Sequence, residues 1–484
     1  MRTDMGFAGA EALREAVRGS VLVPGDPEYD QECAGFQAGD RHRPDVLVVA
    51  DGPDDVRAAV DAARRHRLPV AVQATGHGLG EAARGGVLVS TRRMTGIRID
   101  AEARTAWVEA GVRAGDLVAE AARHGLAPVN GSAPGVGVVS YTLGGGVGLL
   151  GRRFGYAADR VRRIDLVAGD GRPRRVTADS DPELFWGLRG GGGGLGVVTG
   201  MEIDLVPVAG IFGGQLVFDG ARHADEVLSA WQRWTATVPE TMSSAVSLLP
   251  VPDIPAVPAH RRGRYLAQVH LAFTGSREEG ERLVAPLRAI GTPLADDLRE
   301  MPYAECASVF SEPDTPHAYR STNLLLGPDG LAEDALRSVR AATGPEAEAM
   351  CVLSMRHMGG AFARPPRVPN AVPHRDAGYL LYVLSPFTAP GEGADAETVR
   401  ALHERALAPA AGCAVGRNAN FLYGPQSPGT LWEVYGDGRA AGEGSRLARL
   451  RALKQRYDPE GLFRFSLLGA EGETGAPNDA PVIA

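Results

Sequence analysis

His77 is the residue of this sequence whose surroundings most clearly indicate chemistry. It lies in the stretch Thr75-Gly76-His77-Gly78-Leu79-Gly80, which follows an apolar run, Val70–Val72, expected to form a buried strand. Alternating glycines leave the loop backbone bare, so its N–H groups can approach a phosphate closely. The imidazole would then project beside the bound group. The alternative is a glycine-rich turn that carries a solvated histidine.

Two further glycine clusters fit the spacing G-x-G-x-x-G. The glycines are Gly146, Gly148 and Gly151 in the first cluster, and Gly191, Gly193 and Gly196 in the second. A dinucleotide-binding fingerprint needs a strand before the glycines and a helix after them. The second cluster has the reverse order, because the helix-like run 185–188 precedes it and the strand-like run 197–199 follows. We therefore reject a nicotinamide-type Rossmann site. Three glycine-rich loops could still bind a long phosphorylated ligand: 74–80, 131–148 and 190–196. The alternative is that they are tight turns that bind no ligand.

Alternating strands and helices are predicted to hold these loops. Between Asp45 and Val208, short apolar runs such as Val46–Val49 alternate with amphipathic helices, the first of which opens at Pro53. Beyond Pro207 longer strand patterns dominate, separated by helices such as 223–237; the strands are expected at 214–218, 265–273, 349–355 and 379–385. Such a pattern favours one broad antiparallel sheet with helices on one side. The predicted fold class is therefore α+β.

Length and composition exclude several classes of protein. At 484 residues the chain is expected to form two or more domains. A net charge of −8, without a long basic run, argues against nucleic acid or a membrane as partner. Four scattered cysteines without a Cys-x-x-Cys pair indicate free thiols, so neither a metal site nor a dense disulfide framework is expected. The N-terminus has no secretory signal pattern, and a bacterial cytoplasmic protein is expected.

A set of longer motifs, taken in chain order, is more specific than any single glycine spacing. It comprises Gly76-His77, Gly131-Ser132-Ala133-Pro134-Gly135-Val136-Gly137, Leu143–Gly148, Arg153-Phe154-Gly155 with Asp159, Asp181–Gly190, Gly196–Thr199 and, near the C-terminus, Lys454, Tyr457-Asp458-Pro459 and Leu462-Phe463. These motifs resemble the berberine bridge enzyme-like family of FAD-linked oxidases, in the vanillyl-alcohol-oxidase superfamily. The resemblance covers residues 20–206 and 412–468.

The resemblance implies a fold with three parts. Residues 1–206 would form a PCMH-type FAD-binding domain of two α+β subdomains. Residues 207–411 would form a substrate-binding domain with a broad antiparallel sheet flanked by helices, and residues 412–484 a segment that packs back on the FAD-binding domain. FAD would lie between the two subdomains, with its pyrophosphate on loop 74–80 and its isoalloxazine facing the sheet of the middle domain.

The resemblance also assigns a cofactor role to His77. This residue matches the histidine that such proteins link covalently to the flavin 8α-methyl group, and the link makes the flavin a stronger electron acceptor and prevents its loss. Many relatives have a second link through a cysteine; because Ala133 stands at that position, only a single link is expected. Val136 matches a valine found in relatives that react well with oxygen. The residues expected against FAD are Gln73, Ala74, Thr75, Gly76, His77, Gly78, Leu79, Ala133, Pro134, Val136, Gly137, Val138, Ser140, Tyr141, Gly144, Gly145, Gly148, Gly196, Val198, Asn420 and Phe421.

The catalytic bases used in the family are missing here. The tyrosines of its Tyr-x-Asn-Tyr motif are replaced in Asn418-Ala419-Asn420-Phe421, and the base glutamate of the berberine-forming plant enzymes falls roughly at Arg364. A base must reach the substrate proton and have a suitable pKa. The remaining catalytic candidates are Tyr141, His357 and Tyr423, with Tyr379 and Tyr382 weaker. Each could instead be a packed aromatic ring or a structural histidine.

The function implied by the resemblance is that of an FAD-dependent oxidase. It would remove a hydride from a C–H next to O or N of a medium-sized organic molecule, and oxygen would reoxidise the flavin to give hydrogen peroxide. Secondary-metabolite tailoring is the expected context, with a small-molecule substrate and O₂ as partners and a monomer or homodimer as the assembly. The alternatives are a carbohydrate or alcohol oxidase with an unconventional base, and a flavoprotein without net redox chemistry, either a cyclase or a binding protein.

Overall fold

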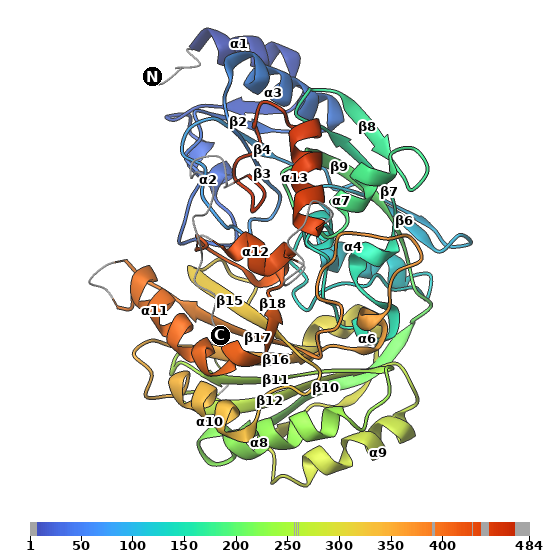
Figure 1. The fold of residues 1–484 in the computed structure, drawn as a ribbon, viewed down its shortest axis with the longest axis vertical. Helices are drawn as coiled ribbons and strands as arrows, with labels where there is room; N and C mark the ends of the chain where they lie inside the picture. Colours follow the sequence, from blue (N-terminus) through green and yellow to red (C-terminus); the bar gives the residue numbers. More distant parts are fainter. Residues whose placement is uncertain are drawn as a thin grey trace.

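Three β-sheets organise the part of the chain that a computed structural model describes, residues 7–469 except 256, 258, 260, 390–392, 428 and 437–444. A four-stranded and a five-stranded sheet form the N-terminal half, and a nine-stranded sheet fills the other end of the molecule (Figure 1). This mixture of helices with largely antiparallel sheets confirms the predicted α+β class. Residues 471–484 of the predicted C-terminal segment lie outside the described residues.

The four-stranded sheet leads directly into the loop of His77. Its order is β1 (Ser20–Leu22), β2 (Val46–Val49), β4 (Val87–Ser90) and β3 (Val70–Gln73), with β2 and β3 parallel to β4 and with α1 (Phe7–Ala16) and α2 (Tyr29–Cys33) beside it. The predicted helix at Pro53 is confirmed as α3 (Pro53–His66), which connects β2 to β3. The prediction of a wholly buried strand at Val70–Val72 is wrong in part. Val72 is 45% exposed, because β3 is the edge strand of the sheet.

The five-stranded antiparallel sheet holds the two later glycine clusters. Its order is β5 (Ile97–Asp100), β6 (Thr105–Glu109), β9 (Val197–Asp204), β7 (Val161–Val167) and β8 (Pro173–Val176). Its core includes residues of α4 (Ala114–Ala122), α5 (Val138–Leu143) and α7 (Pro182–Leu188), and the first cluster continues into α6 (Gly151–Phe154) and the 3₁₀ helix η1 (Ala157–Arg160). The second cluster runs from α7 into β9. The reversed order that excluded a Rossmann site is therefore confirmed.

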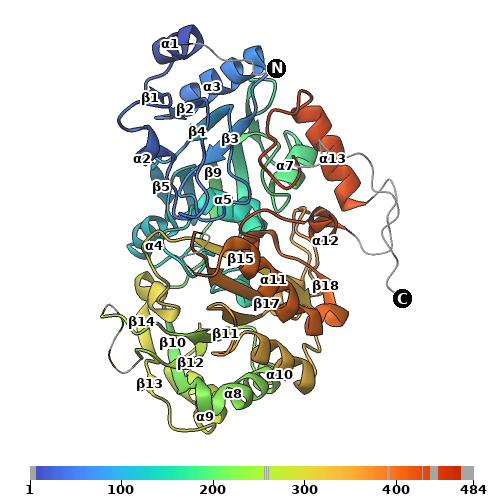
Figure 2. The same ribbon diagram turned by 90° about the vertical axis from the view of Figure 1, so that its left-hand side faces the viewer.

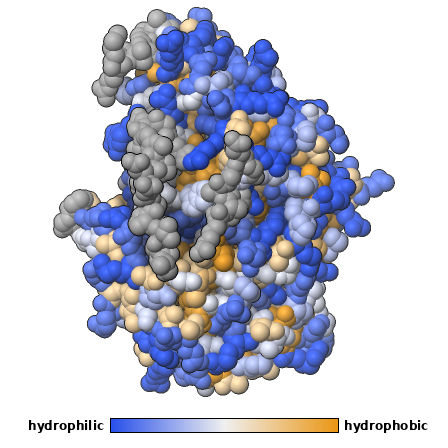
Figure 3. All heavy atoms as spheres, viewed as in Figure 1, coloured by the Kyte–Doolittle hydropathy of each residue, from blue (hydrophilic) through white to orange (hydrophobic). Residues whose placement is uncertain are grey.

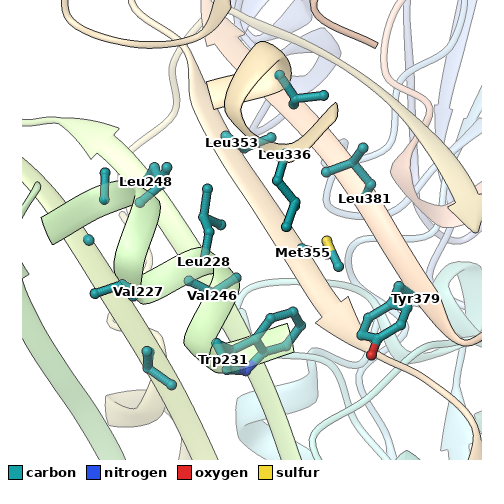
Figure 4. Close-up of a cluster of buried hydrophobic side chains, with 14 of the residues drawn as sticks. Val227, Leu228, Trp231, Val246, Leu248, Leu336, Leu353, Met355, Tyr379 and Leu381 are labelled. Atoms are coloured by element: carbon teal, nitrogen blue, oxygen red, sulfur yellow. The ribbon is translucent and has the colours of Figure 1, made fainter. Parts of the chain in front are cut away.

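The nine-stranded sheet packs its helices against one face (Figures 1 and 2), as predicted. The strand order is β13 (Ala295–Asp296), β10 (Gly210–Asp219), β12 (Tyr265–Phe273), β11 (Met242–Pro250), β16 (Val352–His357), β17 (Tyr379–Pro386), β15 (Tyr319–Leu326) and β18 (Ala414–Gly416), with β14 (Arg299–Pro302) beside β10. The helices are α8 (Gly220–Thr235), α9 (Arg277–Arg288), α10 (Glu333–Ala342) and α11 (Ala396–Leu407). Trp231 of α8 meets Met355 and Tyr379 of the sheet in their shared core (Figure 4).

The opposite face of this sheet turns toward the N-terminal half and carries polar side chains among apolar ones such as Leu325 and Leu380. Leu353 and Met355 of β16 point into the helical core, so Ser354 and Arg356 point the other way, because successive side chains of a strand alternate between faces. Ser354 pairs with Tyr382 of β17 in the strand register. Arg356 reaches a loop of the N-terminal half, where it donates to the Ser132 Oγ at 3.0 Å. Polar groups of the broad sheet therefore line the junction between the two halves.

The C-terminal segment returns to the N-terminal half through α12 (Thr430–Tyr435) and α13 (Arg446–Tyr457), and α13 lies beside α7 (Figure 1). Ser445 caps α13, since its hydroxyl accepts from the Ala448 N–H at 3.2 Å. Lys454 donates to the carbonyl oxygens of Gly194 and Phe463 and pairs with Asp458 at 2.5 Å. The segment therefore closes over the second glycine cluster. The remaining short 3₁₀ helices are η2 (Tyr303–Val309), η3 (Gly360–Ala363), η4 (Ala408–Cys413) and η5 (Ala419–Phe421).

The surface is mainly polar on the face shown in Figure 3, and the cysteines lie apart from one another. The face in Figure 3 is mainly hydrophilic, with apolar residues in small separate areas. In the described ranges, every helix is too short or too polar to cross a bilayer. Cys33, Cys306, Cys351 and Cys413 are all free thiols. Within the same ranges, no group of three or more His, Cys, Asp or Glu side chains could hold a metal ion.

Buried histidines should make the fold sensitive to acid. Burial lowers the pKa of His42, His270 and His403 from 6.5 to about 4. Between these values the unfolded chain binds protons that the folded protein does not, so the free energy of unfolding falls as the pH falls from 6.5 toward 4. We expect a loss of about 1–2 kcal/mol per histidine at pH 5. Urea unfolding at pH 7.5 and at pH 5 measures this difference in the free energy of unfolding. The variant His403→Gln should reduce the difference by the contribution of one histidine. An equal urea midpoint at both pH values would contradict the prediction.

Candidate functional site

The loop after β3 is fixed in place before it reaches His77. Gly76 has a φ of 74°, in the left-handed region that favours glycine. A Cβ at Gly76 would come within 2.6 Å of the Gly35 Cα, so the two backbones pack directly on each other. The Phe36 N–H donates to the Thr75 carbonyl at 2.9 Å, and Tyr319 donates its hydroxyl to the His77 carbonyl at 2.7 Å. Chain segments from both halves of the molecule therefore hold this loop.

The His77 ring is oriented by stacking and by a hydrogen bond. It lies parallel to the Phe36 ring, with 3.9 Å between centroids and 8° between planes. Its Nδ1 is 2.9 Å from the Thr75 Oγ1. Its Nε2 edge faces the next loop, where a Cβ at Gly135 would lie 3.3 Å from Nε2. Burial lowers the pKa of His77 to about 4, with smaller contributions from Arg113 and His317, so the imidazole is neutral at physiological pH.

The three glycine loops predicted from the sequence converge in the structure. Gly137 lies against loop 74–80, because a Cβ there would be 3.7 Å from the Ala74 Cβ. The Leu143 carbonyl accepts from the N–H groups of Gly190 and Gly192, at 3.0 and 2.9 Å, which joins the second loop to the third. Partly or fully exposed positions remain along loops 74–80 and 131–148: Ala74, Thr75, Gly76, His77, Gly78, Leu79, Ala133, Pro134, Val136, Ser140, Tyr141, Gly144 and Gly148. These residues could contact a bound cofactor directly.

Other predicted cofactor residues have their side chains turned away from these loops. Gln73 is buried, with its amide donating to the Cys33 carbonyl at 3.4 Å. Val138 and Val198 pack in the core of the five-stranded sheet. Gly137 and Gly145 are buried, and a Cβ at Gly196 would lie 2.8 Å from the Val167 carbonyl oxygen. These positions can reach a cofactor only through their main chain or by shaping the loops.

Asn420 connects the C-terminal segment to the first glycine cluster. Its amide nitrogen donates to the Tyr141 carbonyl at 3.0 Å, and its amide oxygen accepts from the Gly146 N–H at 2.9 Å. Neighbouring Phe421 lies beside Tyr382 of the broad sheet, with ring centroids 5.0 Å apart. Both residues therefore reach the junction of the two halves, and their contact with the cofactor stays a prediction.

Replacing Asn420 by alanine is expected to loosen the first glycine cluster. The change leaves the Gly146 N–H and the Tyr141 carbonyl without a partner, which we expect to lower the free energy of unfolding by about 1–3 kcal/mol. Urea unfolding measures the effect. Gln426→Ala is the matched control, since that amide bonds only two residues back, to the Gly424 carbonyl. Equal losses for both variants would contradict the role given to Asn420.

Two of the three catalytic candidates face the same part of the junction. The Tyr141 hydroxyl is buried and has no hydrogen-bond partner in the described part of the chain. Burial raises the pKa of Tyr141 well above its usual range, and likewise that of Tyr423. The positive charge of Arg356 lowers the pKa of both phenols, but this effect is smaller than the rise caused by burial. Neither tyrosine is therefore ionised at physiological pH in this protein alone.

The third candidate, His357, lies on the other face of the sheet. It follows Arg356 in β16, so its side chain points toward the helical core. Its ring stacks at 5.8 Å from Tyr379, and its Nε2 lies 2.7 Å from the Arg152 Nη1. Burial, with the nearby Arg152, lowers the pKa of His357 to about 3. The structure does not bring His357 together with Tyr141 and Tyr423.

Three polar residues at this junction were missed by the sequence analysis. Ser132 donates its hydroxyl to the Glu312 carboxylate at 2.6 Å and accepts from Arg356 at 3.0 Å. Arg356 and Glu312 themselves are 3.8 Å apart. The alternation of Leu353, Ser354, Met355 and Arg356 was a signal for a buried arginine on the polar face of a strand. Nothing in the sequence indicated Glu312, which belongs to a loop after η2.

The convergent loops fit the shape and chemistry of FAD. Bare backbone at loops 74–80 and 131–148 suits a pyrophosphate, which binds to main-chain N–H groups. The neutral His77 ring and the unpartnered Tyr141 hydroxyl offer a donor set for a polar ring system beside them. FAD supplies hydride-accepting chemistry when it is bound at such a site.

Comparison with known proteins agrees with this fit. The FAD binding domain family matches residues 44–177. The (R)-6-hydroxynicotine oxidase of Paenarthrobacter nicotinovorans is 28% identical over 93% of this chain and 96% of that protein. The crystal structure of 6-hydroxy-D-nicotine oxidase from Arthrobacter nicotinovorans has a TM-score of 0.79 at 25% identity, covering 93% of this chain and 97% of that one. BBE-like 1 of Physcomitrella patens, 20% identical, shares the fold with a TM-score of 0.79 over 94% of this chain and 97% of its own. From its FAD-binding domain, its fold and these relatives, the chain is an FAD-linked oxidoreductase, similar to the berberine bridge enzyme-like oxidases.

Proposed function

We propose that this protein is an oxidase that removes a hydride from a C–H next to O or N of a medium-sized organic substrate. Residues 1–206 and 412–484 would hold FAD, and residues 207–411 would hold the substrate. Molecular oxygen would take up the two electrons and two protons as hydrogen peroxide. A role in tailoring secondary metabolites fits the same proposal, since the missing sugar-oxidase tyrosines argue against an oligosaccharide substrate.

The single observation that carries this proposal is the setting of His77. Its neutral ring, fixed by Phe36 and Thr75, lies where loops 74–80 and 131–137 meet. A neutral imidazole has a free lone pair and can act as a nucleophile, whereas a protonated ring cannot. We therefore propose His77 as the covalent link to FAD, and as the sole link because Ala133 has no thiol. A permanently bound, strongly oxidising flavin is suited to an oxidase.

The protein's own groups suit a substrate that needs no strong base. Tyr141 and Tyr423 are neutral phenols that can donate a hydrogen bond, and either could accept a proton as a base only after losing its own. Glu312 brings a carboxylate to this junction, where it accepts a hydrogen bond from Ser132. An amine, whose nitrogen lone pair assists loss of a hydride from the neighbouring carbon, fits this set better than an alcohol that must first be deprotonated.

Anaerobic mixing of the yellow protein with candidate substrates tests the proposal. The panel contains 6-hydroxynicotine, other cyclic amines, aromatic alcohols and chitooligosaccharides. We expect an amine or alcohol to bleach the flavin absorbance, and readmitted air to restore it with one hydrogen peroxide per turnover. Bleaching by oligosaccharides alone would favour a carbohydrate oxidase instead. Product formed without bleaching would show a flavoprotein without net redox chemistry and overturn the proposal.

A further inference from the structure

Arg356 is a buried cation near the end of β16, on the face of the broad sheet that turns toward the N-terminal half. Its relative exposure is 7%. Its guanidinium lies over the Phe310 ring at 4.5 Å, and near the Phe421 and Tyr382 rings at 5.3 and 5.7 Å. Aromatic faces attract a cation, but they do not neutralise its charge. A buried arginine in such surroundings normally has a hydrogen-bonded anionic partner as well.

The protein supplies Arg356 with an incomplete set of partners. Ser132 accepts a hydrogen bond from the guanidinium at 3.0 Å, and the Tyr382 ring lies 5.7 Å from it. The Arg356 Nε–H is buried and has no partner in the residues that the structure describes. The carboxylate in reach, Glu312, is 3.8 Å away, a third exposed, and already bonded to Ser132. A buried donor without a partner costs free energy, and a cation paired so loosely can still attract another anion.

A cavity lies next to this guanidinium. Its lining includes Arg356 and His357 of β16, His270, Phe310 and, from the first glycine cluster, Val147 and Gly148. His270 is also buried with an unpartnered ring nitrogen, Nε2, because its Nδ1 bonds the Val309 carbonyl at 2.9 Å. The cavity thus lies between the broad sheet and a loop predicted to contact the flavin. Tyr141, from the same loop region, and Tyr423 lie within electrostatic range of Arg356.

We propose that Arg356 binds a carboxylate of the substrate, so that this oxidase acts on organic anions whose oxidisable C–H lies near a carboxyl group. A guanidinium presents parallel N–H donors that match the two oxygens of a planar carboxylate. The rings of Phe310 and Phe421 would flank the substrate, and Glu312 would move aside toward solvent. This inference rests on the proposed function, since it names the class of substrate at the same site.

Binding of benzoate and benzamide to the purified holoprotein tests the inference. The two probes have nearly the same shape and differ in charge. We expect benzoate to perturb the oxidised flavin spectrum and to bind at least ~10-fold more tightly than benzamide, with calorimetry as a second readout. Arg356→Gln should weaken benzoate binding ~30-fold or more and change benzamide binding less than ~3-fold. Glu312→Gln should tighten benzoate binding, because it removes the competing carboxylate.

Arg364→Gln is the matched control for the charge change, since Arg364 is exposed and pairs with Glu240. It should leave both affinities unchanged. Thermal unfolding and flavin content establish that each variant folds, and Glu312→Gln keeps the test decisive if Arg356→Gln does not fold. Equal affinities for benzoate and benzamide, or a Glu312→Gln variant that binds benzoate no better, would overturn the inference. The inference would also be overturned if the Arg356→Gln variant bound benzoate as tightly as the wild type and only its flavin reduction potential changed. Binding to oxidised flavin needs no turnover, so these outcomes are independent of the bleaching test.

Discussion

His77→Ala is expected to release the flavin from the protein. After acid precipitation, the yellow colour should stay with the pellet of the wild-type protein and move entirely to the supernatant of the variant. The physical reason is that His77 presents the neutral ring nitrogen proposed to bond the flavin, and Ala133 offers no second link. Mass spectrometry of the intact denatured protein should show the mass of FAD in the wild type and its absence in the variant.

His317→Ala is the matched control for this experiment. His317 belongs to the same aromatic group, with its ring centroid 5.5 Å from that of Phe36, yet no covalent role is proposed for it. The control variant should keep its colour in the pellet. If wild-type protein itself loses the flavin on precipitation, the covalent link is wrong, although noncovalent FAD binding would stand. Colour retained by His77→Ala would move the link to another residue.

Asp458→Ala is expected to have the largest effect on stability. Asp458 is 3% exposed, and its carboxylate accepts from the N–H groups of Leu462 and Phe463, at 2.8 and 2.9 Å, and from Lys454 at 2.5 Å. Removing one partner of a buried pair leaves the other charge uncompensated, so we expect the free energy of unfolding to fall by about 3–5 kcal/mol. Urea unfolding, followed by circular dichroism, measures the loss.

The Asp458 change should also reach the four-stranded sheet. The Val70 N–H, at the start of the strand that leads to His77, donates to the Leu462 carbonyl at 2.8 Å. Glu460→Ala, two residues away on the exposed surface, is the control and should change stability by less than about 0.5 kcal/mol. A loss below 1 kcal/mol for Asp458→Ala would contradict the structural role of this segment.

Local sequence signals predicted most of the elements around the site. α3 begins at Pro53 because proline suits the first helical position, and Ser276 and Ser445 cap α9 and α13 through their hydroxyls. These features depend on neighbours along the chain, so they can be read from one sequence. The predicted burial of Val72 was wrong because β3 is an edge strand, and the residues of a strand do not specify whether it lies at an edge.

The predicted site divides in the same way. Loops 74–80, 131–148 and 190–196 were found because bare glycine backbone is a local property, and they do converge. His357 was chosen from its place near Gly359, but strand alternation turns it to the face opposite Arg356. The helices that pack on one face of the broad sheet decide which side of each strand faces the N-terminal half. Most of those helices are far from β16 in the sequence.

The sequence by itself determined the three glycine loops, the candidate link at His77 and the absence of the bases used in the similar family, because residue identity and short spacing carry that information. Only the tertiary structure decided how Ser132, Glu312 and Arg356 meet, since Ser132 lies 180 residues before Glu312 and 224 residues before Arg356. Their contact depends on strand register and on the fit between the two halves. A buried cation without a full set of partners becomes visible only when every neighbour is in place.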